Sequence, residues 1–264
     1  MRHRALRSLP LHAVLSRRIL VFLTTVLLCA GASAGAVSAQ DGTTTTAAPT
    51  PTTGAPTTST TTTPPPPPTS LQLTGAPLAK GSNGLDVAFV QARLAQRGVF
   101  LQDSLGRFGE PTRHAVVAFQ KFAGLPRTGR VDFWTRLALA VSTERLAPRS
   151  PQAGHSIDVD LGRQVLIIQT NGRTDGVFDI SSGKPSTPTP RGGFRLTRQI
   201  RGLRVSDLGQ LWQPKYFTGG YALHGSPSVP AYAASHGCVR MTNQEIDYLW
   251  SSGLAEIGTP VSLS

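Results

Sequence analysis

The chain has 264 residues and is strongly basic, with 26 lysines and arginines against 14 acidic residues and a formal net charge of +12. This charge favours an anionic partner, either nucleic acid or a polymer of the cell envelope. The sequence has two cysteines, Cys29 and Cys238, and no pair of histidines at the spacing of metal ligands. It therefore predicts no metal site, and no cofactor is implied.

Residues 1–39 are expected to be a secretory signal peptide. Five arginines and no acidic residue occur in residues 1–18, an apolar stretch follows from Ile19 to Ala30, and small residues end the segment. The apolar stretch is short for a membrane-spanning helix, which favours cleavage, with an uncleaved membrane anchor as the alternative. Cleavage removes Cys29, so that Cys238 can form no intramolecular disulfide, and it leaves a net charge of +7. Export favours an envelope polymer and disfavours nucleic acid as the partner.

Residues 40–70 are expected to be a disordered linker. The segment is almost entirely threonine, proline, alanine and glycine, and it contains five consecutive prolines from Pro64 to Pro68. Such a composition cannot bury a core, and the proline run is extended and semi-rigid. We expect a spacer that carries the folded parts away from the membrane.

Residues 71–147 are expected to form a small all-α domain of three helices. Val87, Val90 and Leu94 recur at helical spacing before Gly98. A second helix is predicted from Pro111 to Gly124, and a short third one around residues 134–137. A unit of this size has a small core, so we expect it to be marginally stable but independent.

Residues 152–264 are expected to form a mostly-β domain, a meandering sheet or a sandwich with one short helix. The β-forming segments are separated by glycine turns. They are residues 156–161, 164–170, 176–181 and 193–199. The capping box from Thr242 to Glu245 predicts the start of the helix.

Cys238 and two histidines are the residues most suited to chemistry. A thiol attacks only as its thiolate and needs a nearby proton acceptor. His236 lies two residues before Cys238 and shares its face of an extended strand, whereas His224 lies 14 residues before it and returns across a loop. Gly237 allows close approach to amides that stabilise an oxyanion. A buried structural cysteine with hydrogen-bonded histidines is the other interpretation.

Residues 152–264 also resemble an L,D-transpeptidase catalytic domain of the YkuD type. The resemblance rests on His224-Gly225, a variable loop and Ser235-His236-Gly237-Cys238, with a threonine-proline turn upstream at 183–192 and a last strand at 258–261. Arg240 stands where other members carry asparagine, and the loop is shorter than in many members.

The resemblance implies a role for each motif residue. It makes Cys238 the nucleophile and His224 the proton acceptor and donor, oriented by a neighbouring backbone carbonyl, with His236 in support. The remaining residues would bind substrate or oxyanion. These are Ser235, which fixes the turn, Gly237, whose amide joins those of His236 and Cys238 in the oxyanion hole, Arg240, which meets a substrate carboxylate, Gly225, and Tyr232. Tyr232, like Trp212, is a candidate for the pocket wall, with a core position as the alternative.

Most of residues 71–147 resemble a helical peptidoglycan-binding domain. The resemblance rests on an ordered series of short matches, each of which is weak alone. They are residues 80–87, Gln91, Leu94, residues 106–109, Thr112, residues 115–116, 119–120 and 124–125, and Gly129. The family's Asp-Gly before phenylalanine is replaced by Leu105-Gly106. Whether this domain binds glycan or peptide, or only spaces the catalytic domain, remains open.

Together the two resemblances imply an exported cell-wall enzyme that forms 3→3 peptidoglycan cross-links. Cys238 would accept an acyl group from a tetrapeptide stem and release D-alanine. The implied partners are stem peptides and glycan, with carbapenem-type β-lactams as covalent inhibitors, no nucleic acid, and membrane contact only through the signal or anchor. The alternatives are an L,D-carboxypeptidase, another wall-peptide hydrolase, and a non-catalytic peptidoglycan-binding protein.

Overall fold

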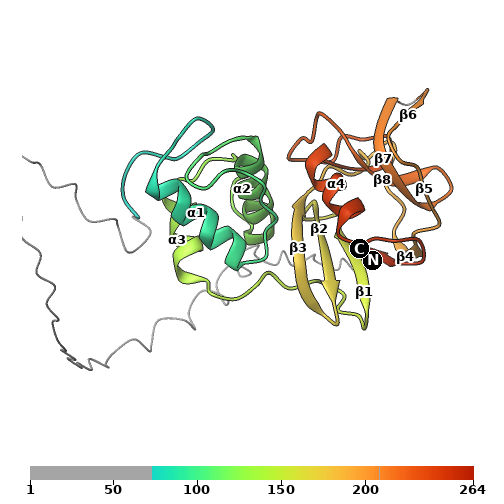
Figure 1. Ribbon diagram of the computed structural model, residues 1–264, viewed down its shortest axis with the longest axis horizontal. Helices are drawn as coiled ribbons and strands as arrows, with labels where there is room; N and C mark the ends of the chain where they lie inside the picture. The colour runs from blue at the N-terminus through green and yellow to red at the C-terminus, as the bar shows by residue number, and fades with distance from the viewer. Residues whose placement is uncertain (1–72, 208) are drawn as a thin grey trace, which may run out of the picture. The chain divides into compact units, whose positions relative to one another are not determined.

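The computed structural model describes residues 73–207 and 209–264 (Figure 1). The predicted signal segment 1–39 and the predicted linker 40–70 lie outside these residues. Among the helices that the structure describes, none is both long enough and apolar enough to cross a bilayer.

Within the described residues, three helices precede the first strand, as predicted. They are α1 (Leu85–Gln96), α2 (Glu110–Ala123) and α3 (Phe133–Val141). Helix α2 has proline in its first turn and ends at Gly124, whose φ of 69° is the left-handed conformation that favours glycine at this position. The side chain of Asp132 caps α3 by accepting a hydrogen bond from the Thr135 amide at 2.8 Å.

The rest of the chain is mostly β, also as predicted. The first sheet has the strand order β3-β2-β1-β10-β4. Its strands are β1 (His155–Asp160), β2 (Val165–Thr170), β3 (Arg173–Asp179), β4 (Gly192–Arg195) and β10 (Pro260–Leu263). Strand β1 pairs in parallel with β10 and antiparallel with β2.

The second sheet has the order β5-β7-β8-β9, with β6 paired to β7. Its strands are β5 (Arg198–Gln199), β6 (Leu203–Ser206), β7 (Gly209–Thr218), β8 (Tyr221–Gly225) and β9 (Val239–Met241). The segment 193–199, predicted as one strand, is two. Its first part pairs with β10 in the first sheet and its last part with β7 in the second, so the chain changes sheets between them.

The two sheets share one apolar core, which makes the domain sandwich-like. Ile157 and Leu166 of the first sheet are fully buried in the same cluster as Leu223 and Val239 of the second. Helix α4 (Asn243–Ser251) contacts β7 and β8 and adds Ile246 and Leu249 to this cluster. Its predicted capping box is present. Since α4 begins two residues after β9 ends, it anchors the segment that carries Cys238.

A second apolar core joins the helices to the outer strands of the first sheet. Val165 and Ile167 of β2 and Val177 of β3 belong to the same buried cluster as Val90 and Phe119 of the helices. Strand β2 is therefore buried on both faces, which explains its nearly continuous apolar sequence. The β-domain therefore contributes to the core of the helical unit, which was expected to be independent.

A buried lysine also connects α2 to the first sheet. The Lys121 ammonium group is fully buried and forms an ion pair with Asp179 of β3. It also donates to the carbonyl oxygens of Gln164 at 3.1 Å and Ile180 at 2.6 Å. His114 of α2 contacts the other Asp179 carboxylate oxygen through Nδ1 at 2.7 Å. Lys121 therefore fixes the end of β3 against α2, through Asp179 and Ile180.

Candidate active site

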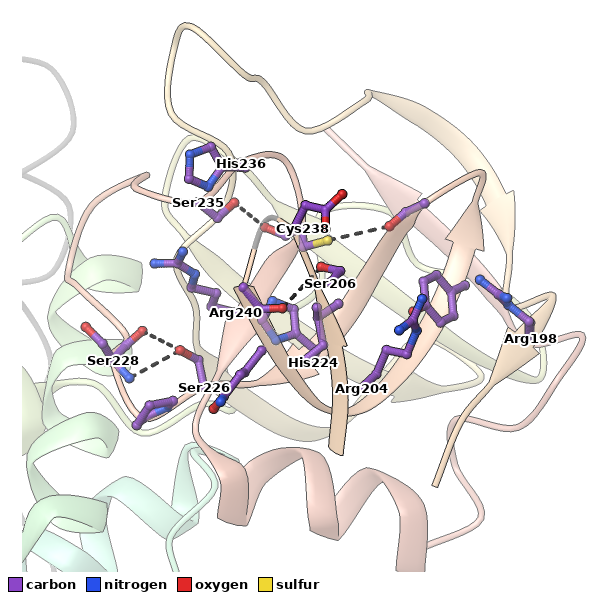
Figure 2. A pocket seen from close by; sticks show the side chains of 17 residues that line it. Arg198, Arg204, Ser206, His224, Ser226, Ser228, Ser235, His236, Cys238 and Arg240 are labelled. Carbon is purple, nitrogen blue, oxygen red and sulfur yellow. Dashed lines mark hydrogen bonds between the residues drawn. The ribbon is translucent and has the colours of Figure 1, made fainter. Parts of the chain in front are cut away.

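Cys238, His224 and His236 line one cavity of about 690 Å³ (Figure 2). Ser235 and Arg240 line it as well, and residues of β5, β6 and β7 form much of the remaining wall. A cavity of this size accommodates a ligand of several residues. The structure thus brings together the motif residues that are 14 positions apart in the sequence.

The parallel pairing of β8 with β9 explains why His224 and Cys238 meet. Leu223 pairs with Val239, and both side chains are buried in the sandwich core. Because successive side chains of a strand alternate, the neighbouring residues His224, Cys238 and Arg240 point to the opposite face, into the cavity. His224 therefore lies on β8 and Cys238 lies immediately before the adjacent strand β9, an arrangement that spacing along the chain does not reveal.

His224 is held in one tautomer by its neighbour. Its Nδ1 lies 2.9 Å from the carbonyl oxygen of Gly225, which can only accept, so Nδ1 carries the hydrogen and Nε2 is the free acceptor. Burial lowers the pKa of His224 to about 4, and the nearby Arg240 guanidinium acts in the same direction. His224 is consequently neutral at physiological pH and can take a proton.

The Cys238 thiol is partly buried and close to the backbone. Its Sγ lies 3.7 Å from the carbonyl oxygen of Gly220. Burial raises the pKa of the Cys238 thiol, and this effect exceeds the opposite one of the Ala222 backbone and of Arg240. The resting site therefore contains a neutral thiol and a neutral imidazole in one cavity, and reaction requires transfer of the thiol proton to a base.

Ser235 closes the turn that carries the thiol. Its hydroxyl donates to the Cys238 carbonyl oxygen at 2.5 Å and accepts from the Gly237 amide at 3.0 Å. Gly237 has a φ of +114°, and a Cβ added there would lie 2.4 Å from the Tyr221 ring. Glycine is therefore required at this position. The Gly237 amide was expected to face an oxyanion, but it donates its hydrogen bond to the Ser235 hydroxyl instead.

The segment that follows β3 forms hydrogen bonds with the turn that carries Cys238. Ser182 accepts hydrogen bonds at its carbonyl oxygen from the amides of Ala234 and Ser235, both at 2.9 Å. Ser181 and Arg240 exchange backbone hydrogen bonds of 2.9 and 3.0 Å. Thr189, from the predicted threonine-proline turn, donates its hydroxyl to the Gly237 carbonyl oxygen at 2.7 Å. The motif signalled that turn, but no pattern singled out Ser181 and Ser182.

His236, the histidine that spacing favours as the base, lies differently. Its side chain is exposed, and in Figure 2 the ring points away from the Cys238 sulfur. It lines the rim of the cavity and has none of the fixed contacts that orient His224. The arrangement favours His224 as the base, which agrees with the role implied by the resemblance.

Comparison with known proteins places the chain in a family. The L,D-transpeptidase catalytic domain matches residues 154–263, and a putative peptidoglycan binding domain matches residues 83–139. The solved L,D-transpeptidase of Xylanimonas cellulosilytica DSM 15894 is 40% identical, with a TM-score of 0.69, over 72% of this chain and 98% of that one. The chain belongs to the L,D-transpeptidase family.

Two further L,D-transpeptidase structures are similar to this chain at lower identity. An L,D-transpeptidase from Stackebrandtia nassauensis is 21% identical over 71% of this chain and 94% of that one, with a TM-score of 0.44. L,D-transpeptidase 3 from Mycobacterium tuberculosis, solved with a faropenem-derived adduct, is 19% identical over 42% of this chain and 60% of that one, with a TM-score of 0.37. A search of curated proteins found no match.

Two aromatic candidates do not line the cavity of this L,D-transpeptidase. The Tyr232 side chain is 66% exposed and is not part of the cavity wall, although its carbonyl oxygen accepts from the Ser181 hydroxyl at 2.7 Å. Trp212 donates from its indole nitrogen to Asp247 of α4 at 2.7 Å and packs against the sandwich core. For Trp212 the alternative of a core position therefore holds, whereas Tyr232 lies exposed outside the wall. The aromatic side chain in the wall is Tyr216.

Gly225 has a packing role in addition to orienting His224. A Cβ added there would lie 2.7 Å from atoms of Asn243 and Ile246 and 2.9 Å from Trp212. Glycine therefore allows α4 to pack closely against β8. The carbonyl oxygen that fixes the imidazole is held by this packing.

Proposed function

We propose that this L,D-transpeptidase is an exported enzyme that forms 3→3 cross-links in peptidoglycan with Cys238 as nucleophile. The observation that supports the proposal most is the pairing of a neutral His224, whose Nε2 is free to accept, with Cys238 in one substrate-sized cavity. The implied acyl donor is a tetrapeptide stem, whose third residue supplies the acyl group and whose terminal D-alanine leaves. In this proposal His224 carries out the proton transfers and Cys238 the acyl transfer, so no metal or cofactor is invoked.

In the first half-reaction, His224 Nε2 accepts the thiol proton while Sγ attacks the carbonyl carbon of the third stem residue. The tetrahedral intermediate carries its negative charge on the former carbonyl oxygen. The carbon–nitrogen bond to D-alanine then breaks, and the imidazolium returns its proton to the leaving amine. The products are a thioester on Cys238 and free D-alanine.

In the second half-reaction, an amine of a neighbouring stem attacks the thioester. His224 accepts a proton from the amine, the carbon–sulfur bond breaks, and the proton passes to the leaving sulfur. The result is an amide that links two third residues and a regenerated thiol. If water replaces the amine, the same acyl-enzyme gives an L,D-carboxypeptidase, which is the second candidate function.

Backbone amides would stabilise the oxyanion in both steps. Because the Gly237 amide donates to Ser235, we assign this role to the amides of His236 and Cys238. Gly237 contributes its lack of a side chain, which leaves the approach to these amides open. Arg240, beside the thiol in the cavity, would bind the carboxylate of the leaving D-alanine.

The other parts of the chain would bring the site to its substrate. We assign residues 1–39 to export, by a cleaved signal or an uncleaved anchor, residues 40–70 to a spacer, residues 71–147 to peptidoglycan binding and residues 152–264 to catalysis. A carbapenem-type β-lactam would acylate Cys238 through its strained amide, in the same way as the donor stem.

Product analysis tests this proposal and separates its alternatives. The chain from residue 71 to the end would be incubated with a disaccharide-tetrapeptide, and the products identified by mass spectrometry. Free D-alanine together with 3→3 dimers supports transpeptidation, whereas monomeric tripeptide alone supports carboxypeptidation. Absence of both dimers and tripeptide would move the assignment to a peptidoglycan-binding protein.

A further inference from the structure

Three arginines line the cavity that contains Cys238. Arg240 comes from β9 beside the thiol, whereas Arg198 of β5 and Arg204 of β6 belong to a different wall. Figure 2 shows Arg198 and Arg204 on the side of the cavity away from His236 and Ser235. The proposed mechanism uses Arg240 and leaves the other two arginines without a role.

These guanidinium groups have no acidic partner in residues 73–207 and 209–264. None of the ion pairs found there includes Arg198, Arg204 or Arg240. The cavity wall contains one acidic residue, Asp207. The cavity therefore carries an excess of positive charge, which a bound anion would neutralise.

The contacts of Arg198 and Arg204 leave hydrogen-bond donors available. The Arg198 guanidinium stacks on the ring of Tyr216, 4.0 Å from its centroid, and Tyr216 is itself buried. Since all five donors of a guanidinium lie in its plane, stacking fixes the group without using them. Arg204 donates one N–H to the backbone carbonyl oxygen of Val205 and keeps its other donors. Two oriented forks of this kind suit a carboxylate.

We propose that Arg198 and Arg204 form a second carboxylate-binding site, which selects donor stems that carry a free carboxylate on the acyl side of the bond to be broken. This inference rests on the proposed function, in which the carboxylate of the leaving D-alanine is bound by Arg240. A carboxylate on the acyl part of the donor lies farther from that bond and needs a cation elsewhere in the cavity. Amidation of this carboxylate would remove its negative charge, and the site would then no longer favour that donor.

Binding measurements on an inactive background test the site without relying on turnover. Isothermal titration calorimetry on the Cys238→Ala chain would use two disaccharide-tetrapeptides, one with free acyl-side carboxylates and one with these carboxylates amidated. We expect the added pair Arg198→Gln and Arg204→Gln to weaken binding of the free donor by about tenfold, because charge-assisted hydrogen bonds are lost. Binding of the amidated donor should change less than about twofold, since it makes no such bonds.

Arg201→Gln is the matched control. Arg201 is exposed, lies between the two arginines in sequence, stacks on Trp250 at 4.8 Å and does not line the cavity. Its loss removes a positive charge from the same region, so a general electrostatic effect would appear in this variant too.

A selective loss for the free donor in the double variant alone supports the site. The site is overturned by an equal loss for both donors, by the same loss in Arg201→Gln, or by no loss for the free donor, which includes its failure to bind the Cys238→Ala chain. The proposed function is tested separately, by thioester formation in the chain with Cys238 intact. A donor that binds selectively but never acylates Cys238 would contradict that function and leave the carboxylate site standing.

Discussion

The two histidines beside Cys238 differ in how the fold holds them. His224 is buried on β8 and fixed through Nδ1 by the Gly225 carbonyl oxygen, whereas His236 is exposed at the rim of the cavity. Proximity in sequence favours His236, yet burial and a fixed tautomer belong to His224. A general base is thus recognised by the contacts that orient its ring, and not by its distance from the nucleophile along the chain.

Substitution of each histidine gives the largest expected difference. In His224→Ala the thiol loses its proton acceptor, so we expect the rate of Cys238 acylation to fall by roughly 10²- to 10⁴-fold, the range of general base catalysis. In His236→Ala, which keeps the backbone amide, the rate should remain within about threefold because no fixed contact is lost. Stopped-flow acylation by a carbapenem measures both. Equal losses in the two variants would remove the distinction.

The same contrast between buried and exposed groups applies to two lysines. Lys121 is fully buried against Asp179, whereas Lys80 forms an exposed ion pair with Glu110. We expect Lys121→Met to lower the free energy of unfolding by about 3–5 kcal/mol, because it leaves a buried carboxylate without its main partner. Lys80→Met should cost less than about 1 kcal/mol. Denaturant unfolding of both variants checks this, and similar midpoints would contradict it.

Two glycines near Cys238 differ in the space around them. Gly237→Ala places a Cβ against the Tyr221 ring in a backbone conformation with positive φ, so we expect it to destabilise the protein by about 1–3 kcal/mol. A Cβ at Gly220 meets nothing within 4 Å, which makes Gly220→Ala the matched control. Thermal unfolding compares the two. A normal midpoint for Gly237→Ala would show that the turn tolerates a side chain.

The smallest expected effect is that of pH. Because the pKa of His224 is lowered to about 4, its imidazole loses the ability to accept a proton only as the pH falls toward that value. The acylation rate should therefore vary little between about pH 5 and pH 8, with no step near the ordinary histidine pKa of about 6.5. A step there that disappears in His236→Ala would instead make His236 the base. The measurement is the rate of Cys238 acylation as a function of pH, with the tetrapeptide donor and no acyl acceptor present.

Local sequence signals predicted the elements of this fold well. The apolar spacing of α1, the proline and glycine at the ends of α2, and the capping box of α4 each act within a few residues, so the sequence shows them directly. The mostly-β character of the remainder follows from its alternating segments.

What was missed depends on contacts between distant segments. The return of His224 to Cys238 was expected, but the parallel register of β8 and β9 that brings it there was not. The support from Ser181 and Ser182 requires the chain after β3 to reach the nucleophile turn. Lys121 belongs to a helix, where lysine is usually solvated, and its burial follows only from the core shared with β2 and β3. The Tyr232 ring does not line the cavity; the residue contacts the segment after β3 through its backbone carbonyl oxygen, which accepts from Ser181.

Intact-protein mass spectrometry of the acylated enzyme shows whether the reaction passes through a Cys238 thioester. The chain with Cys238 intact and the Cys238→Ala variant would each be mixed with a disaccharide-tetrapeptide and quenched in acid. We predict an adduct equal in mass to the donor minus D-alanine on the first protein, strongly reduced in His224→Ala and absent from Cys238→Ala. The same adduct on Cys238→Ala, or none on the intact enzyme while D-alanine is still released, would contradict catalysis through a Cys238 thioester.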